Sequence, residues 1–327
     1  GLGDVYKRQD QLISVTSAPQ SGYSTRKMNA GLIRNRGVEL SLGGMPVSTK
    51  NWKWEMNFNI AKNSNKLVEL ADGVDSYSIY WTSFTTRLYN YAMVGKSLGV
   101  ITGNTWERDD NGNIIFHELS ASQKALYGGE YVPTYNQNTL DELGNFHPDF
   151  TGGFNTSISF KNFRLSANID FSVGGQIVSY TNMWGSSSGI LDKTAELNDR
   201  GVNVREPVSK GGGIHMTGVD QNGNKVDTYV NAKLYYTTAS RVWEEWVYDR
   251  TYVKLREVSL SYVFPSQTLK KLNIGLSRAS VAINASNPWL IYSACPNVDV
   301  SEIGMGYFEG GNAAATRSIG FTVNLAF

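Results

Sequence analysis

Apolar and polar residues alternate strictly over several stretches of this chain, and the last stretch, 316–327, is the most regular. Its apolar positions are Ile319, Phe321, Val323, Leu325 and Phe327, and the residues between them are small or polar. A period of two is that of a β-strand with one apolar and one polar face. A dozen residues at about 3.3 Å each reach roughly 40 Å, which suffices to cross a lipid bilayer at a tilt of about 45°.

The same alternation recurs in several other stretches. They are 37–44, 52–62, 150–160, 163–172, 252–264 and 278–286. Only Lys161 and Asn162 separate 150–160 from 163–172, which predicts a tight hairpin. With a short strand near Leu12, the pattern predicts about eight strands. Their polar faces carry Arg, Lys, Glu and Asp, and two tryptophans, Trp52 and Trp54, stand at one end of a strand as in an interfacial aromatic girdle.

The connections between these strands alternate in length. The short ones are 45–51, 161–162 and 265–277, and the long ones are 63–149, 173–250 and 288–315. An outer-membrane β-barrel has short turns on the periplasmic side and long loops outside, and antiparallel parity assigns each connection accordingly. The alternative is a secreted, soluble β-sandwich that binds carbohydrate, which would bury its apolar faces against a second sheet. The alternation of short and long connections favours the transmembrane barrel, an all-β antiparallel fold.

Composition excludes other classes. The 327 residues carry a net charge of +1, which argues against nucleic acid as a partner. No apolar run is long enough for a transmembrane helix, and the single cysteine, Cys295, excludes an internal disulfide framework. The chain does not begin with Met, and GLGDVYKRQ resembles translated sequencing-adapter sequence. We therefore expect residues 1–9 to be a non-native leader and 10–327 to be the barrel part.

Several motifs, in this order, resemble one known family. They are NAGLIRNRGVELSL (29–42), WKWEMNFNIAKNSNK (52–66), HPDFTGGFNTSISFKNFRLS (147–166), FSVGGQI (171–177), YVKLREVSLSYVFP (252–265) and the closing strand. The first is similar to the family pattern N-x-G-x-I-x-N-x-G-x-E, and the third to P-x-F-T-G-G-F. These are C-terminal barrel signatures of SusC/RagA-type TonB-dependent outer-membrane transporters of Bacteroidetes.

The resemblance implies a location in the outer membrane and a large, plugged barrel. Such transporters import oligosaccharides or, in some members, peptides. They work with a SusD-like surface lipoprotein and take energy from the TonB complex. The resemblance implies no cofactor and no enzymatic activity. Neither a plug nor a TonB box is recognisable, so we expect an open fragment of about eight strands whose last strand has one unpaired edge.

The resemblance also suggests which residues have a role. The terminal aromatic strand resembles the assembly signal of outer-membrane barrels, carried here by Phe321, Val323, Leu325 and Phe327. Tryptophans in the long loops could stack on sugar rings. They are Trp81, Trp106, Trp184, Trp243 and Trp246, of which Trp81 and Trp184 are the candidate substrate contacts. The competing interpretation is that they pack loop against loop.

One stretch formally matches a hydrolase motif. GSSSG (185–189) fits G-x-S-x-G with Ser187 as nucleophile, and Asp192 or Asp199 and then His215 follow in α/β-hydrolase order. The motif acts only on a strand-to-helix elbow of a parallel sheet, and no βαβ pattern surrounds it. A small-residue loop is the favoured interpretation, and no catalytic residue is predicted.

No metal site is predicted either. Asp109–Asn113 and Asp220–Asn224 carry alternating oxygen ligands but lack the distal Glu of a calcium loop, so Asn-Gly turns are favoured. The three histidines, His117, His147 and His215, show no metal spacing and are expected in loops. Cys295 is expected to be a lone loop or rim thiol.

Overall fold

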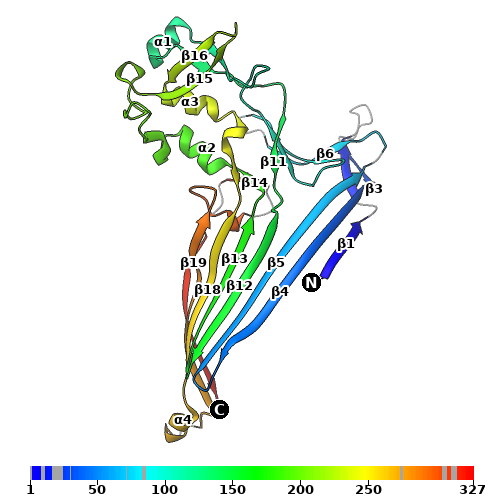
Figure 1. Ribbon diagram of the computed structural model, residues 1–327, viewed down its shortest axis with the longest axis vertical. Helices are drawn as coiled ribbons and strands as arrows, with labels where there is room; N and C mark the ends of the chain where they lie inside the picture. The colour runs from blue at the N-terminus through cyan, green and yellow to red at the C-terminus, as the bar shows by residue number, and fades with distance from the viewer. Residues whose placement is uncertain are drawn as a thin grey trace.

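An eight-stranded antiparallel sheet dominates the structure, a computed structural model (Figure 1). In spatial order its strands are β1 (Leu2–Arg8), β4 (Leu32–Ser48), β5 (Trp52–Glu69), β12 (Phe150–Phe160), β13 (Phe163–Val173), β18 (Tyr252–Val263), β19 (Arg278–Ser293) and β21 (Ser318–Ala326). The structure describes residues 2–8, 12–16, 25–29, 31–70, 72–82, 86–272, 275–303, 308–310 and 315–327. For residues before 31, and for Tyr80, Trp81, Thr82 and Leu272, it describes the backbone alone.

One face of this sheet is apolar because its strands pair in phase. A single row of register partners runs through Trp54, Ile158, Leu165, Leu260, Ile283 and Phe321, across six neighbouring strands. We call this side the apolar face. In this row, Ile158, Leu165, Leu260, Ile283 and Phe321 are exposed, from 38% for Ile158 to 68% for Phe321, and Trp54 is partly exposed.

The expected apolar residues share this face. Phe154 pairs with Ile169, Phe163 with Tyr262, and Val323 with Val281. Leu325 has the same phase as Val323 along β21. No second sheet covers the face within the described ranges, which contradicts the β-sandwich alternative. The opposite, polar face is the hollowed one, with a concavity of about 260 Å³ over β5, β12 and β13.

The short connections meet at one end of the sheet, which we call the turn end. The amide of Lys161 donates to the carbonyl of Asn51 at 2.8 Å, and that of Val263 to the carbonyl of Asn162 at 2.9 Å. Helix α4 (Ser266–Leu272) lies at this end, and the long connections emerge at the other, the loop end (Figure 1). The predicted parity of the connections is confirmed.

Several sequence-based boundaries were wrong, and β4 (Leu32–Ser48) extends beyond the predicted 37–44 at both ends. The long connections begin later than expected, because β5 continues to Glu69 and β19 to Ser293. On β5 the ladder continues after the apolar alternation stops, and on β19 a register shift hides the pattern. The eighth strand is β1, whereas the strand near Leu12, β2 (Leu12–Thr16), pairs with β3 (Thr25–Asn29) in a separate hairpin.

The edge strands agree with an open sheet. Among the described residues, β21 pairs with β19 and with no other strand, and β1 forms the opposite edge of the sheet.

The long connections are folded rather than irregular, and we call residues 70–149 and 174–251 the loop domain. One of its sheets has the strand order β11 (Asp141–Asn145), β8 (Val100–Gly103), β7 (Leu88–Met93) and β6 (Ser76–Thr82). Another has the order β10 (Tyr131–Pro133), β9 (Ile115–Glu118), β15 (Ile214–Asp220) and β16 (Lys225–Val230). Strands β17 (Val247–Asp249), β14 (Gln176–Ser179) and β20 (Phe308–Glu309), the last from the third long connection, form a further sheet. The helices are α1 (Ala121–Tyr127), α2 (Tyr180–Ser187), α3 (Ala232–Ala239), η2 (Asp192–Ala195), η3 (Val208–Lys210) and η4 (Trp243–Trp246), with η5 (Val300–Glu302) in the third connection.

A buried aromatic core holds the loop domain together. Trp106, Trp243 and Trp246 are fully buried and pack in one cluster with Tyr180 and Met183. These residues come from segments far apart in the sequence, so no local pattern predicts this core.

Candidate functional site

The polar face is lined mainly by neutral hydrogen-bonding groups. Asn57, Asn155 and Asn168 are register partners on three adjacent strands, and the last donates to Glu257 at 3.3 Å. Toward the turn end, the carboxylate of Glu55 accepts from Ser157 at 3.1 Å and pairs with Lys53 and Arg164. Amides and hydroxyls of this kind can hydrogen-bond to polar solutes without binding them as tightly as fixed charges would.

At the loop end of the polar face, a buried lysine holds η5 against the sheet. The amine of Lys254, which is only 1% exposed, lies 2.7 Å from Asp299 and 2.6 Å from Glu302 and donates to Ser301 at 3.1 Å. Arg256 bridges Glu302 to Asp170, with its Nε 2.9 Å from an Asp170 oxygen.

The pKa values of the two carboxyl groups reflect this pairing. Burial alone would raise the pKa of Asp299, but hydrogen bonds from Lys254 and Ser301 hold it below the ordinary value. The hydrogen bond from Lys254 likewise lowers the pKa of Glu302. Both groups therefore stay ionised at neutral pH, and the network fixes η5 above the polar face. Sequence reasoning missed this network because its partners are more than forty residues apart.

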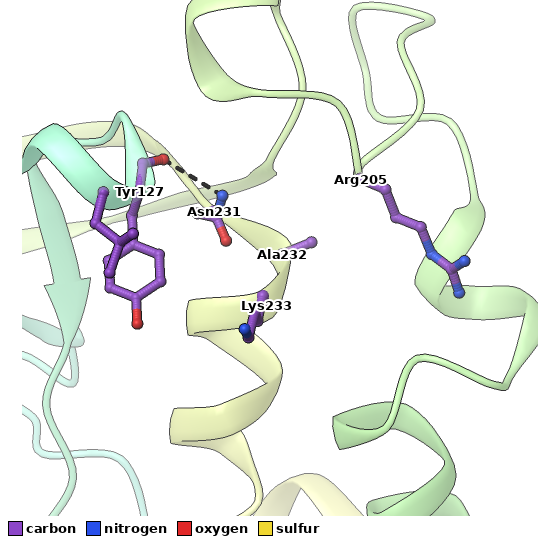
Figure 2. Close-up of a pocket in the computed structure, with 6 residues that line it drawn as sticks. Tyr127, Arg205, Asn231, Ala232 and Lys233 are labelled. Carbon is purple, nitrogen blue, oxygen red and sulfur yellow. Dashed lines mark hydrogen bonds between the residues drawn. The ribbon is translucent and has the colours of Figure 1, made fainter. Parts of the chain in front are cut away.

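The loop domain contains a pocket of about 330 Å³ between α1 and α3 (Figure 2). Asn231 caps α3 through its side-chain oxygen and donates its amide to the carbonyl of Tyr127 at 3.3 Å. The guanidinium of Arg205 points away, and its Nε donates to the carbonyl of Thr194 at 2.8 Å. The exposed Lys233 completes the wall, so the pocket offers polar groups but no catalytic arrangement.

The candidate tryptophans separate into two groups. Trp106, Trp243 and Trp246 are core residues of the loop domain, as the packing interpretation expected. Trp184, on α2, is 48% exposed. Trp81 lies in β6, but its side chain is outside the described residues, so its role stays a prediction.

The residues of the formal hydrolase motif form no triad. Ser187 ends helix α2, which corrects the loop interpretation, and its hydroxyl donates to the carbonyl of Trp184 at 3.2 Å. The two ring nitrogens of His215 face Asp199 at 2.9 Å and Asp227 at 2.8 Å. Asp192 accepts from the amide of Lys193.

The carboxylate of Asp199 also accepts a hydrogen bond from a hydroxyl group. Tyr229 donates to it at 2.7 Å, and this hydrogen bond lowers the pKa of Asp199.

Both acidic stretches are hairpin turns. The carboxylate of Asp109 accepts from the amides of Asn111 and Asn113, and that of Asp220 accepts from the equivalent amides in its own turn. Gly112 and Gly223 adopt φ angles of 83° and 82°, which glycine tolerates best. In the described part of the chain, no cluster of His, Cys, Asp and Glu is placed to hold a metal ion.

Two histidines were expected in loops but belong to strands. His117 lies in β9 and His215 in β15, whereas His147 lies in the connection between β11 and β12. Burial lowers the pKa of His147.

Cys295 lies in the connection after β19, as expected, but it is not an accessible rim thiol. It is 1% exposed and packs with Ile177 and Val300. Burial raises the pKa of this thiol to about 12.

We expect Cys295 to resist maleimide in the folded protein. A pKa near 12 leaves roughly a thousandth of the usual thiolate at neutral pH, and packing blocks approach. Mass spectrometry of labelled peptides should show modification at least about a hundredfold slower than at an exposed control, Ser188→Cys. Equal labelling of both positions would contradict the buried placement.

The proposed assembly residues lie on the last strand. Phe321, Val323 and Leu325 are exposed on the apolar face, and Phe327 follows the end of β21. Among the described residues, no helix is both long and apolar enough to span a membrane.

Comparisons with curated proteins find relatives of one kind. The chain is 27% identical over 301 residues to TonB-dependent receptor P3 of Formosa agariphila, covering 90% of this chain and 28% of that protein. It is 24% identical to receptor P26 of the same bacterium, over 98% of this chain and 32% of the relative. With TonB-dependent receptor SusC of Bacteroides thetaiotaomicron it shares 30% identity over 54% of this chain and 18% of that protein. No protein-family model matches the sequence.

Solved structures agree on the fold. The RagAB peptide importer in its closed-closed state matches 99% of this chain and 33% of that chain, with a TM-score of 0.67 and 18% sequence identity. The open-open state of the same importer gives the same TM-score at 17% identity. The chain thus spans about a third or less of the length of these relatives, which are receptors or importers.

These sequence relatives, the shared fold and the exposed apolar face identify the chain as part of a TonB-dependent receptor of the SusC/RagA type, and its sheet as part of a β-barrel wall.

Proposed function

We propose that this chain is the C-terminal barrel portion of an outer-membrane transporter that imports oligosaccharides or peptides. The observation that carries the proposal is the pairing of a continuous exposed apolar face with a polar opposite face. A sheet of this kind can meet lipid on one side and water on the other. The loop domain lies outside the cell in this proposal, and the turn end faces the periplasm. We also propose that residues 1–9 are a non-native leader, whose strand β1 occupies the edge beside β4, and that 10–327 is the barrel part.

Partners and energy coupling follow from the same proposal. A SusD-like surface lipoprotein covers the loop domain, and the TonB complex drives import through parts of the protein beyond this chain. SusC and the RagAB importer support this assignment by similarity.

Deletion of the gene in the source bacterium tests the import function. Growth of the deletion strain on oligosaccharides or on peptides as the sole nutrient should fall, and the full-length gene should restore it. The class of nutrient on which the deletion strain grows less well identifies the cargo. Unchanged growth and uptake on both classes would overturn the proposal.

Trp184 is the proposed cargo contact with a described side chain. Its exposed indole offers a flat apolar surface of the kind on which sugar rings or apolar side chains stack. Trp184→Ala should lower uptake severalfold, and Trp184→Phe should retain more of it. Equal uptake by wild type and both variants would remove Trp184 from the cargo path.

Phe327 is the proposed end of the assembly signal. Deleting it from the full-length protein should lower the amount of folded barrel in the outer membrane, because the apolar strand loses its terminal aromatic group. Phe327→Tyr, which keeps the ring, serves as the control and should assemble normally. Heat-modifiable mobility on a gel measures the folded fraction, and equal amounts for all three proteins would exclude this role.

A further inference from the structure

On β4 and β5, the positions that face the same side as the apolar face continue toward the loop end, beyond the last apolar pairs. In register, Leu42 pairs with Phe58 and Leu40 with Ile60. The next rows on the same face are Val38 with Lys62, Arg36 with Ser64, and Arg34 with Lys66. We call Arg34, Arg36, Lys62 and Lys66 the basic patch.

The basic patch contains cations in direct opposition. Arg34 and Lys66 are cross-strand partners, so their Cβ atoms lie about 5 Å apart, and Arg36 is diagonal to Lys62 at roughly 7–8 Å. Like charges placed directly opposite each other destabilise a sheet. A bound anion would remove this repulsion.

Among the side chains that the structure describes, no carboxylate neutralises the patch. None of its four cations forms an ion pair with a residue whose side chain the structure describes. Glu39, the register partner of Ala61, lies on the other face of the sheet. Glu69 is the register partner of Leu32 at the end of the ladder and forms no ion pair with the patch. The charge is therefore available to a partner.

The patch lies at the boundary of the apolar face. The amine of Lys62 stands 4.9 Å from the ring centre of Phe150, which is in the outward phase of β12. At the same end, β13 and β19 carry Val173 and Trp289 instead of cations. The long β4–β5 pair, which Figure 1 shows running up one side of the sheet, is thus the part with a basic rim.

We propose that the basic patch binds the phosphate groups of phosphorylated lipid headgroups at the outer boundary of the bilayer. Guanidinium groups bind phosphate oxygens in a bidentate manner, and ammonium groups add point charges. An apolar band directly below the patch would hold the acyl chains of the same lipid. This continuity of apolar and basic surfaces favours a lipid over a soluble anion or an acidic protein. The inference rests on the proposed placement of the sheet in the outer membrane.

The test uses the full-length protein in vesicles of digalactosyldiacylglycerol, a bilayer lipid without phosphate, that contain labelled lipid A. Wild-type protein should bind lipid A, and dephosphorylated lipid A should bind at least about tenfold more weakly, because each cation near a charged membrane surface contributes about a factor of five. The variant R34Q/R36Q/K62Q/K66Q should show the same loss. The control variant K210Q/K225Q/K270Q/K271Q, which removes four exposed cations elsewhere, should bind as wild type does.

Each other outcome contradicts the inference. Equal binding of the two lipids would assign the contact to acyl chains alone, and competition by equimolar inorganic phosphate would assign the patch to a free anion. An equal loss of lipid A binding in both variants would show that binding depends on the net charge of the protein and not on the basic patch. Insertion into the vesicles is scored separately by heat-modifiable mobility. Failure to insert would therefore count against the proposed function, and insertion without a preference for phosphate would count against this inference alone.

Discussion

Replacing Val258 by arginine should prevent the full-length protein from accumulating as a folded barrel. Val258 lies midway along β18 on the apolar face, between Ala167 and Ala285, and is partly exposed. An arginine on the lipid face near the bilayer midplane costs about 2–4 kcal/mol. That is a large share of the stability of a typical domain.

The neighbouring residue provides the control. Ser259 lies on the polar face, where its hydroxyl donates to Asn284 at 2.6 Å. Ser259→Arg places the same side chain in a polar, hollowed surface and should assemble nearly as well as wild type. Heat-modifiable mobility and protection from protease measure assembly. Similar losses for both arginines would show that the two faces do not differ in the way proposed.

The sequence could predict the sheet because its signal is local. Alternation at 150–160 defined β12 to the residue, alternation at 163–172 defined β13 to within one residue, and the two-residue link defined their hairpin. The same signal failed where the outward residues stopped being apolar. On β5, Lys62, Ser64 and Lys66 occupy outward positions, so the strand looked finished although its ladder continued.

The loop domain could not be predicted because its order comes from contacts between distant segments. Trp106 donates its indole N–H to Glu245 at 2.6 Å across 139 positions of sequence. Such a contact has no periodicity, so three structural tryptophans resembled possible ligand contacts. The exposure of Trp184 distinguishes it from them, and exposure is a property of the fold rather than of the local sequence.

Removing the amine of Lys254 should release η5 from the polar face. Lys254→Met leaves Asp299 without its cation and Glu302 with Arg256 alone. Breaking a buried ion pair from one side costs about 3–5 kcal/mol, and we expect the lower end because the side chain of Glu302 is 35% exposed. Hydrogen exchange of the amides of residues 300–303 should accelerate by roughly a hundredfold at neutral pH.

The pH dependence has a definite sign. The folded-state pKa values of Asp299 and Glu302 are depressed, so the pairing stabilises the protein above the ordinary carboxyl pKa and is lost as the pH falls through the folded values. In Lys254→Met the unpaired carboxyl groups protonate more readily. The difference between variant and wild type should therefore shrink between pH 7 and about pH 4.

The triple variant K254M/D299N/E302Q separates the charges from the packing. It removes the cation and both carboxylates together, so no buried charge is left without a partner, and exchange should return most of the way to wild type. If the triple variant exchanges as fast as Lys254→Met, the lysine stem rather than its charge holds η5. If Lys254→Met exchanges like wild type at pH 7, the network does not anchor η5, and the loop end of the barrel must be held by the loop domain alone.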